Sequence, residues 1–437
     1  MAKQNLEIST PLTLPCGLTL PNRLVKAALA EGWAGRDMLP HADLVDTYRL
    51  WAEGDWGLLL TGNVQVDAAY QGTREDVTIN ERLSRRHHVE AWARWADAAR
   101  ERGTPALVQI NHPGRQSTIG AGTRGICAKS IAPSAVGVNL GPGLVAQAAS
   151  ALVFGTPRAM TDFEIDDVVR RFATAASVAE DAGFAGVEIH AAHGYLLSQF
   201  LSARSNQRTD EYGGTPQKRA RIVVEVIRAI RAAVAPTFCV GIKINSVDHQ
   251  SAGELADCLA QLTEITNAGI DFLEISGGTY EDPKMMVSVA HDTTIKVSAS
   301  TAAREAFFLD FASAIRQTFP KLFLMVTGGF RSRLGLEHAV KSGACDLVGI
   351  GRPSVVEPRL PRSIVFNAEI SDEDAKLPTK RFEQAALSRW FGMKGLGGGT
   401  ETLGYIGEIH RMQKNATAYA ITHIIEDLSW ECAYVNT

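Results

Sequence analysis

Two histidines and a tyrosine lie within six residues at the end of a short apolar run. The run spans residues 186–190 (Gly-Val-Glu-Ile-His), and its last residue, His190, is followed by His193 and Tyr195. Two imidazole N–H groups can bind one carbonyl or nitro oxygen and draw electron density from it, while a phenol can give a proton to the adjacent carbon. A pair of structural polar residues and a metal site are the alternatives, and the metal is disfavoured because no cysteine lies beside the histidines.

Two other polar side chains stand within short apolar runs. Lys243 interrupts the run Cys239–Ile244, and burying a lysine is costly unless it faces an anion. It could stabilise an anionic ring or carboxylate of a ligand, or form a structural ion pair with a neighbouring carboxylate. Gln109 lies near the end of the run Ala106–Ile110, and its amide could bind the carbonyl and N–H groups of a heterocycle or have only a structural role.

Glycines and one arginine mark the ends of two later runs. Gly328 and Gly329 follow one run, and Gly351 and Arg352 follow the next. Backbone N–H groups of glycines can approach a phosphate closely, and an arginine can bind two of its oxygens. These two loops predict a phosphate site, although many phosphate ligands would satisfy it.

Eight apolar runs and the amphipathic stretches between them predict the elements that position these residues. Runs rich in Val, Ile and Leu but too short for helices fit strands that are buried on both faces. The stretches between them carry helix signals, such as a capping box at Thr161–Glu164 and the pair Thr215-Pro216 before an apolar stripe. The runs are Leu24–Ala28, Gly57–Thr61, Ala106–Ile110, Gly186–His190, Cys239–Ile244, Phe272–Ile275, Leu322–Val326 and Leu347–Ile350.

Alternating strands and helices favour a parallel sheet, and eight such units favour a (β/α)₈ TIM barrel, with a doubly wound open sheet as the alternative. In a barrel the reactive residues meet at the carboxyl ends of the strands. Pro11–Pro21 predicts a hairpin beneath the barrel, and residues 111–160 predict a long functional loop. We assign residues 1–370 to the barrel and residues 371–437, with the glycine cluster Gly395–Gly399, to a helical extension packed on it.

Composition limits the classes of partner. The 437-residue chain has a formal net charge of −4 and a pI near 6.3, a balance that recruits neither nucleic acid nor an anionic membrane. It shows no secretory signal and no apolar stretch long enough to span a bilayer. Six cysteines without a C-x-x-C pair indicate neither a disulfide scaffold nor a metal cluster. We expect a cytoplasmic protein that acts on a small molecule without a metal, and homo-oligomer formation stays open.

Several of these segments resemble the Old Yellow Enzyme family of NADH:flavin oxidoreductases and FMN-dependent ene-reductases. The stretch Gly186–Leu201 closely resembles the active-site segment of the family, and Arg208–Gly214 resembles a second motif. Asn22–Val25 resembles the first strand of the family, and the glycines at the ends of the last two runs resemble its flavin phosphate site. The resemblance covers residues 5–365 in the correct order.

The resemblance implies a barrel that holds FMN non-covalently and uses NADH or NADPH as the reductant. It also implies a role for each candidate residue. By position these are Ala28, Leu29 and Ala30 at the flavin ring, Asn63 and Gln109 at its pyrimidine side, Lys243 near N1 and the C2 carbonyl, Gly328, Gly329, Gly351 and Arg352 at the phosphate, and His190, His193 and Tyr195 at the substrate, with Tyr195 as the proton donor.

Two departures from the family pattern indicate a particular branch. Lys243 stands where many members have arginine, which keeps the positive charge but not the planar fork. Ala30 stands where members have threonine or cysteine near flavin O4. Because a methyl group cannot donate a hydrogen bond, we expect a lower flavin potential than in those relatives.

The implied reaction transfers hydride from NAD(P)H through FMN N5 to an activated C=C bond of an α,β-unsaturated carbonyl or nitro compound. Two alternatives stay open at this point. One is flavin-dependent oxidation or demethylation of an amine or alcohol. The other is a non-redox phosphate-binding barrel, such as an aldolase in which Lys243 forms a Schiff base.

Overall fold

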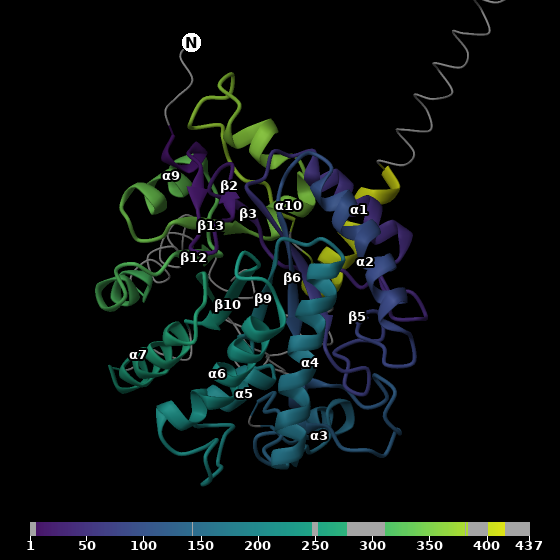
Figure 1. The fold of residues 1–437 in the computed structure, drawn as a ribbon. Helices are drawn as coiled ribbons and strands as arrows, with labels where there is room; N and C mark the ends of the chain where they lie inside the picture. The colour runs from purple at the N-terminus through teal and green to yellow at the C-terminus, as the bar shows by residue number, and fades with distance from the viewer. Residues whose placement is uncertain are drawn as a thin grey trace, which may run out of the picture.

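Eight parallel strands form a closed barrel in the computed structural model, which describes residues 6–141, 143–246, 252–277, 311–380, 382 and 401–415. The last barrel strand pairs with the first and the first with the second, so the sheet closes on itself. All eight predicted runs form strands, which confirms the TIM barrel and excludes the open sheet. The strands are β3 (Leu24–Lys26), β4 (Leu58–Gln65), β6 (Ala106–Asn111), β9 (Gly186–Ala191), β10 (Cys239–Asn245), β11 (Phe272–Ser276), β12 (Leu324–Thr327) and β13 (Leu347–Ile350) (Figure 1).

Helices cover the outside of the barrel, and two of them begin at the capping residues that the sequence predicted. Thr161 and Glu164 form a reciprocal capping box, and Thr215 caps the helix whose first residue is Pro216. In the described part of the chain, no helix combines the length and the hydropathy that a membrane span requires. The helices between strands are α1 (Ala42–Ala52), α2 (Arg85–Arg100), α4 (Asp162–Asp181), α5 (Leu196–Leu201), α6 (Pro216–Ala233), α7 (Ala252–Asn267) and α9 (Arg333–Lys341), and α10 (Arg352–Val356) follows the last strand.

The barrel interior is apolar at its amino-terminal end. Strand residues such as Leu107 and Phe272 pack there against Leu20 of an antiparallel hairpin, which consists of β1 (Leu12–Thr13) and β2 (Thr19–Leu20). The predicted hairpin is therefore confirmed, and it closes this end. Because side chains alternate along a strand, the next residues on the same face also point into the barrel, and several of them are polar.

The segment between β6 and α4 differs from the long loop that the sequence predicted. It contains η2 (Gly114–Gln116), a ten-residue helix, α3 (Leu144–Val153), and two short strands, β7 (Ile131–Ala132) and β8 (Arg158–Ala159), which pair in parallel. The expectation was wrong because the segment as a whole is rich in Gly, Pro and Ser as well as Ala, a composition typical of a loop. The alanines of α3 nevertheless have a high intrinsic helix propensity over that short stretch.

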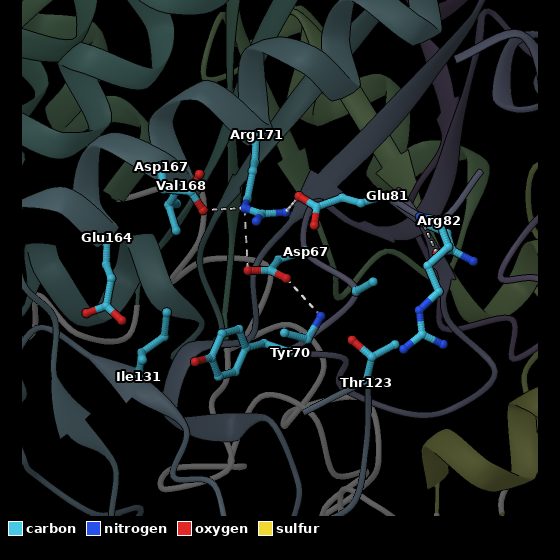
Figure 2. Close-up of a pocket in the computed structure, with 13 residues that line it drawn as sticks. Asp67, Tyr70, Glu81, Arg82, Thr123, Ile131, Glu164, Asp167, Val168 and Arg171 are labelled. Carbon is cyan, nitrogen blue, oxygen red and sulfur yellow. Dashed lines mark hydrogen bonds and ion pairs between the residues drawn. The ribbon is translucent and has the colours of Figure 1, made fainter. Parts of the chain in front are cut away.

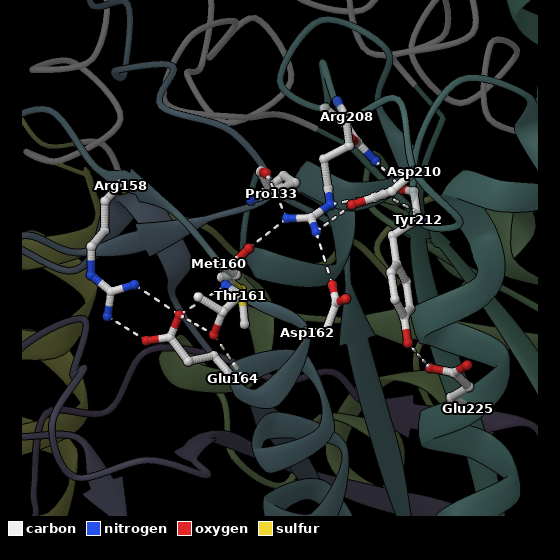
Figure 3. A network of polar contacts seen from close by, with 11 residues as sticks. Pro133, Arg158, Met160, Thr161, Asp162, Glu164, Arg208, Asp210, Tyr212 and Glu225 are labelled. Carbon is white, nitrogen blue, oxygen red and sulfur yellow. Dashed lines mark hydrogen bonds and ion pairs between the residues drawn. The ribbon is translucent and has the colours of Figure 1, made fainter.

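Arg208, from the second family-like motif, ties this segment to the barrel helices (Figure 3). Its guanidinium group donates to the carbonyl oxygens of Met160 at 2.6 Å and Pro133 at 3.3 Å. It also pairs with Asp162 at 3.3 Å and Asp210 at 2.5 Å, while its side chain is only 10% exposed. The motif therefore has a structural role and lies outside the candidate chemistry.

We expect Arg208→Ala to lower the free energy of unfolding by about 2–4 kcal/mol, because the carbonyl oxygens of Met160 and Pro133 lose their donor and two carboxylates lose their ion-pair partner. Urea denaturation measures this change. Arg204→Ala is the matched control: this arginine lies four residues away, its side chain is 85% exposed, and it pairs with Glu254 at the surface. The control should change stability by less than about 0.5 kcal/mol. Equal losses in the two variants would contradict the assigned role of Arg208.

Part of the carboxyl-terminal extension lies against the barrel. Residues 401–415 are helical and form the yellow segment in Figure 1. Tyr405 and Ile409 are buried in the main hydrophobic core, and the ring of His410 stacks on Trp33 with centroids 3.9 Å apart. The glycine cluster that the sequence analysis noted, Gly395–Gly399, lies outside the described residues.

Candidate functional site

A cavity of about 570 Å³ lies at the carboxyl ends of the barrel strands. Each of the eight strands, or the loop that follows it, contributes to its lining. The structure brings every sequence-predicted site residue to this one cavity: Ala28, Leu29, Ala30, Asn63, Gln109, His190, His193, Tyr195, Lys243, Gly328, Gly329, Gly351 and Arg352.

The two imidazoles and the phenol form one contiguous group in the cavity wall. His193 Nδ1 lies 3.1 Å from His190 Nε2, and the rings of His190 and Tyr195 pack edge to face with centroids 4.9 Å apart. His193 has a φ of 56°, which is rare for a residue other than glycine. Its N–H donates to Asn245 Oδ1 at 3.1 Å, which supports this sharp turn after β9.

Both imidazoles are uncharged at neutral pH. Burial, followed by the charge of Lys243, lowers the pKa of His193 to about 3. Burial, with smaller contributions from His193 and Lys243, also holds the pKa of His190 well below its usual range. A neutral imidazole has one N–H donor and one acceptor nitrogen. Ala192 N–H donates to His190 Nδ1 at 3.2 Å, so the proton of neutral His190 is on Nε2, and a substrate oxygen would replace His193 Nδ1 as its acceptor without a formal charge beside it.

A third buried histidine, His112, makes stability depend on pH. Burial is the main reason that its pKa is lowered to about 3. In the unfolded chain a histidine binds its proton near pH 6.5, so only the unfolded state is protonated as the pH falls from about 6.5 to 3. His112 should therefore make the free energy of unfolding fall by about 1.4 kcal/mol per pH unit in this range.

The pH effect of His112 can be isolated by substitution. Urea denaturation of the wild type and of His112→Asn, at several pH values between 7 and 5, should give a shallower loss of stability for the variant. At the acid end of the range, the pH dependence of the free energy of unfolding in the two proteins should differ by an amount that corresponds to the binding of about one proton. Parallel curves for the two proteins would show that His112 is not kept neutral by the fold.

The expected phosphate end of the cavity combines bare backbone with a cation. Gly328 and Gly329 have φ values of 119° and 87°, which glycine adopts without strain, and their backbone carries no side chain that would block a ligand. Arg352 Nη1 lies 2.7 Å from Glu401 Oε2. Glu401 belongs to the helix over residues 401–415, and the sequence analysis missed it because no local signal places that helix beside Arg352.

A layer of buried polar side chains lies inside the barrel, on neighbouring strands. Lys243 Nζ is 2.9 Å from Glu274 Oε1, and Gln109 Nε2 donates to Glu188 Oε2 at 2.5 Å. The ion pair that the sequence left as an alternative for Lys243 is therefore present, and Lys243 also lines the cavity. Glu274 was not predicted as a site residue, although a charged residue within the apolar run Phe272–Ile275 was a usable signal.

The cavity residues fit FMN. Asn63 Oδ1 and Thr327 Oγ1 are buried without a hydrogen-bond partner among the described residues, so a polar ligand would satisfy them. A Cβ atom on Gly62 would lie 2.5 Å from the carbonyl oxygen of Leu29. Only glycine therefore lets the backbone approach Leu29 this closely in the cavity wall. Together with the glycines and arginine of the phosphate end, these groups match a flat heterocycle that bears a phosphate.

Comparison with known proteins identifies the family. The family model for the NADH:flavin oxidoreductase / NADH oxidase family matches residues 7–370. The chain belongs to this family. It is an NAD(P)H-dependent oxidoreductase of the Old Yellow Enzyme type that uses FMN, as the sequence resemblance implied.

Relatives of this flavin oxidoreductase include three fungal proteins. It is 52% identical over 397 residues to the NADH-dependent flavin oxidoreductase iliE of Neonectria sp. (strain DH2), covering 89% of this chain but 52% of that protein. It is 48% identical over 391 residues to iliE of Hypocrea jecorina (strain QM6a), covering 90% of this chain and 97% of the relative. The match to iccE of Talaromyces variabilis, another NADH-dependent flavin oxidoreductase, is 48% over 418 residues, covering 94% and 99%. The chain thus spans about half the length of the Neonectria relative.

Solved structures show the same fold. Morphinone reductase in complex with tetrahydroNAD superimposes with a TM-score of 0.66 at 24% identity, covering 89% of this chain and 97% of that chain. A complex of a point mutant of morphinone reductase with tetrahydroNAD gives a TM-score of 0.64 at 25% identity, covering 82% and 90%. These structures support the closed barrel that is described above.

A smaller cavity of about 260 Å³ lies beside α4 in this flavin oxidoreductase (Figure 2). Arg171 occupies its wall, with Nε 3.6 Å from Asp67 and 2.6 Å from Asp167, and it also pairs with Glu81. No sequence-predicted site residue lines this cavity. It is a cluster of mutually compensating ion pairs, and its lining shares no residue with that of the larger cavity.

The described residues also contain one group of potential metal ligands, which the cysteine spacing did not predict. The ligand atoms of Cys16, Cys239 and Asp271 lie within 4.8 Å of one another at the amino-terminal end of the barrel. Asp271 Oδ2 already accepts hydrogen bonds from Arg231 and from the N–H of Val240, both at 2.7 Å. None of these three potential ligand residues lines the larger cavity.

Proposed function

We propose that this flavin oxidoreductase reduces the activated C=C bond of an α,β-unsaturated carbonyl or nitro compound, with Tyr195 as the proton donor. The proposal depends on one observation: two neutral imidazoles and a phenol stand together in the wall of a cavity that fits FMN. When bound, FMN supplies the redox chemistry that links NAD(P)H to the substrate. The side chains of the protein bind and orient the substrate and move the proton.

The imidazole pair would hold the activating oxygen of the substrate. N–H groups of His190 and His193 can donate to a carbonyl or nitro oxygen and stabilise the negative charge that develops there. The hydroxyl of Tyr195 would give its proton to the carbon next to the carbonyl or nitro group. The edge-to-face contact between Tyr195 and His190 keeps the phenol beside the oxygen-binding group.

The two alternative reactions, a Schiff-base aldolase reaction and the oxidation of an amine or alcohol, do not stand equally. A Schiff-base aldolase is excluded by the family to which the chain belongs, and Lys243 is held 2.9 Å from Glu274. Oxidation of an amine or alcohol would use the same cavity, but no described residue favours it. It is therefore an outcome of the functional test.

The test is anaerobic reduction of the purified yellow protein by NADH and NADPH, followed by mixing with a panel of acceptors. We expect an enone and a nitroalkene to reoxidise the bound cofactor and to yield the saturated product. Turnover of an amine with no reaction of either alkene would overturn the proposed substrate class.

We also propose that residues 1–370 and the extension 371–437 form one functional unit, because Glu401 contacts Arg352 at the expected phosphate end.

Arg352→Gln should weaken FMN binding by about 10- to 100-fold, the loss expected for a charge-assisted hydrogen bond. Quenching of FMN fluorescence measures the dissociation constant. Arg359→Gln is the control, since Arg359 is 51% exposed and pairs with Glu53. Equal affinity in the Arg352 variant would remove this residue from the phosphate site.

A further inference from the structure

Three ionisable side chains are buried in one layer of the barrel interior, next to the imidazoles. Lys243 is paired in register with Glu274 on β11 and with His190 on β9. The side chain of Lys243 is 3% exposed, and Glu274 and Glu188 are fully buried. Burying two carboxyl groups around one ammonium contributes little to stability, so such a group points to a functional reason.

The contacts show how the charges in this layer are distributed. Glu274 holds the ammonium group of Lys243 at 2.9 Å. Glu188 accepts a hydrogen bond from Gln109, but burial and then the charge of Glu274 raise its pKa well above the usual range. The raised pKa favours the neutral form of Glu188, whereas Glu274 lies against the amine group of Lys243.

Only one of these three side chains meets the cavity. Lys243 belongs to the cavity lining, whereas Glu274 and Glu188 do not. A molecule in the cavity would therefore contact the ammonium group of Lys243 and interact with Glu274 over a longer distance. The carboxylate can still act on the molecule by balancing the charge of the lysine.

We propose that Glu274 is a positioning residue that fixes Lys243 at the cavity wall and offsets part of its charge, and so lowers the affinity of bound FMN for electrons. Reduction makes the cofactor more negative, and an unpaired cation would stabilise that form more strongly than a cation with a carboxylate at 2.9 Å. This inference rests on the proposed function, in which FMN lies against Lys243.

The test is the midpoint potential of the FMN-loaded protein at pH 7, measured by spectroelectrochemistry in the wild type and in Glu274→Gln. Glutamine keeps the size of the side chain and removes its charge. We expect the equilibrium constant for two-electron reduction to rise about tenfold, which corresponds to a potential about 30 mV higher. A merely structural role for Glu274 would leave the potential of the folded, FMN-loaded variant unchanged.

Two further variants separate charge from structure. Glu188→Gln is the matched control, because Glu274 rather than Glu188 pairs with Lys243 and the raised pKa of Glu188 favours a neutral acid that glutamine resembles, so it should change the equilibrium constant by less than about twofold. Lys243→Met should lower the potential.

The possible outcomes distinguish a failure of the proposed function from a failure of the inference about Glu274. A wild-type protein that does not retain FMN would overturn both the proposed function and this inference. A yellow wild type that reduces enones, but whose potential is the same in Glu274→Gln, would overturn the inference alone. If Glu274→Gln does not fold, Glu274→Asp serves instead: it moves the carboxylate away from Lys243 and should raise the potential by a smaller amount, and an unchanged or lower value would contradict the proposal.

Discussion

Replacing Tyr195 with phenylalanine should slow enone reduction by about 10²- to 10⁴-fold, the usual contribution of a positioned general acid. The substitution removes only the hydroxyl group, and the ring contact with His190 can persist. Reduction of the bound cofactor by NADH needs no proton from this residue, so its rate should change by less than about threefold. Anaerobic stopped-flow measurement of the two half-reactions separates these effects.

The contrast between the half-reactions is the decisive feature of the Tyr195 prediction. Tyr212→Phe is a matched control, because this tyrosine donates to Glu225 at 3.0 Å in the barrel helices and is absent from the cavity lining. It should leave both half-reactions within about twofold of the wild type. Equal slowing of both half-reactions in Tyr195→Phe would remove Tyr195 from the role of proton donor.

Removing both imidazoles, in the variant His190→Ala/His193→Ala, should lower the rate of enone reduction by at least about 10²- to 10³-fold, the cost of losing donors to a developing oxyanion. Because both imidazoles are neutral, with the pKa of His193 near 3, the loss should be similar across pH 6 to 8. Single-turnover rates at saturating enone measure it.

A conservative replacement tests whether the N–H donor is what matters at the imidazole pair. His193→Asn retains an amide N–H and can still follow the turn at φ 56°, since asparagine tolerates this conformation better than most residues. It should recover much of the activity that His193→Ala loses. If the asparagine and alanine variants were equally impaired, hydrogen-bond donation to the substrate oxygen would not explain the role of His193.

Much of the fold could be predicted from the sequence because strands buried on both faces read as short apolar runs. The cavity followed from the fold, since the carboxyl ends of barrel strands converge on one face. His190, Lys243 and Arg352 could therefore be assigned to one site from their places at strand ends, whereas Ala28 was assigned to it through the family resemblance.

The parts that the sequence did not reveal depend on contacts between distant segments. Glu401 reaches Arg352 only because the helix over residues 401–415 docks on the barrel, and no local pattern specifies such docking. Helix α3 was missed because it lies within a segment whose overall composition resembles a loop. Glu274, unlike Glu401 and α3, had a local signal, because the reasoning that singled out Lys243 also applied to it. A single charged residue in a strand does not, however, identify its partner.

Titration of the yellow wild-type protein with a phenol, monitored as a visible difference spectrum, tests the central claim most directly. The account predicts a long-wavelength charge-transfer band from a phenol held against bound FMN by His190 and His193, and the loss of that band in His190→Ala/His193→Ala. A colourless wild type, or a band of equal strength in the double variant, would contradict it.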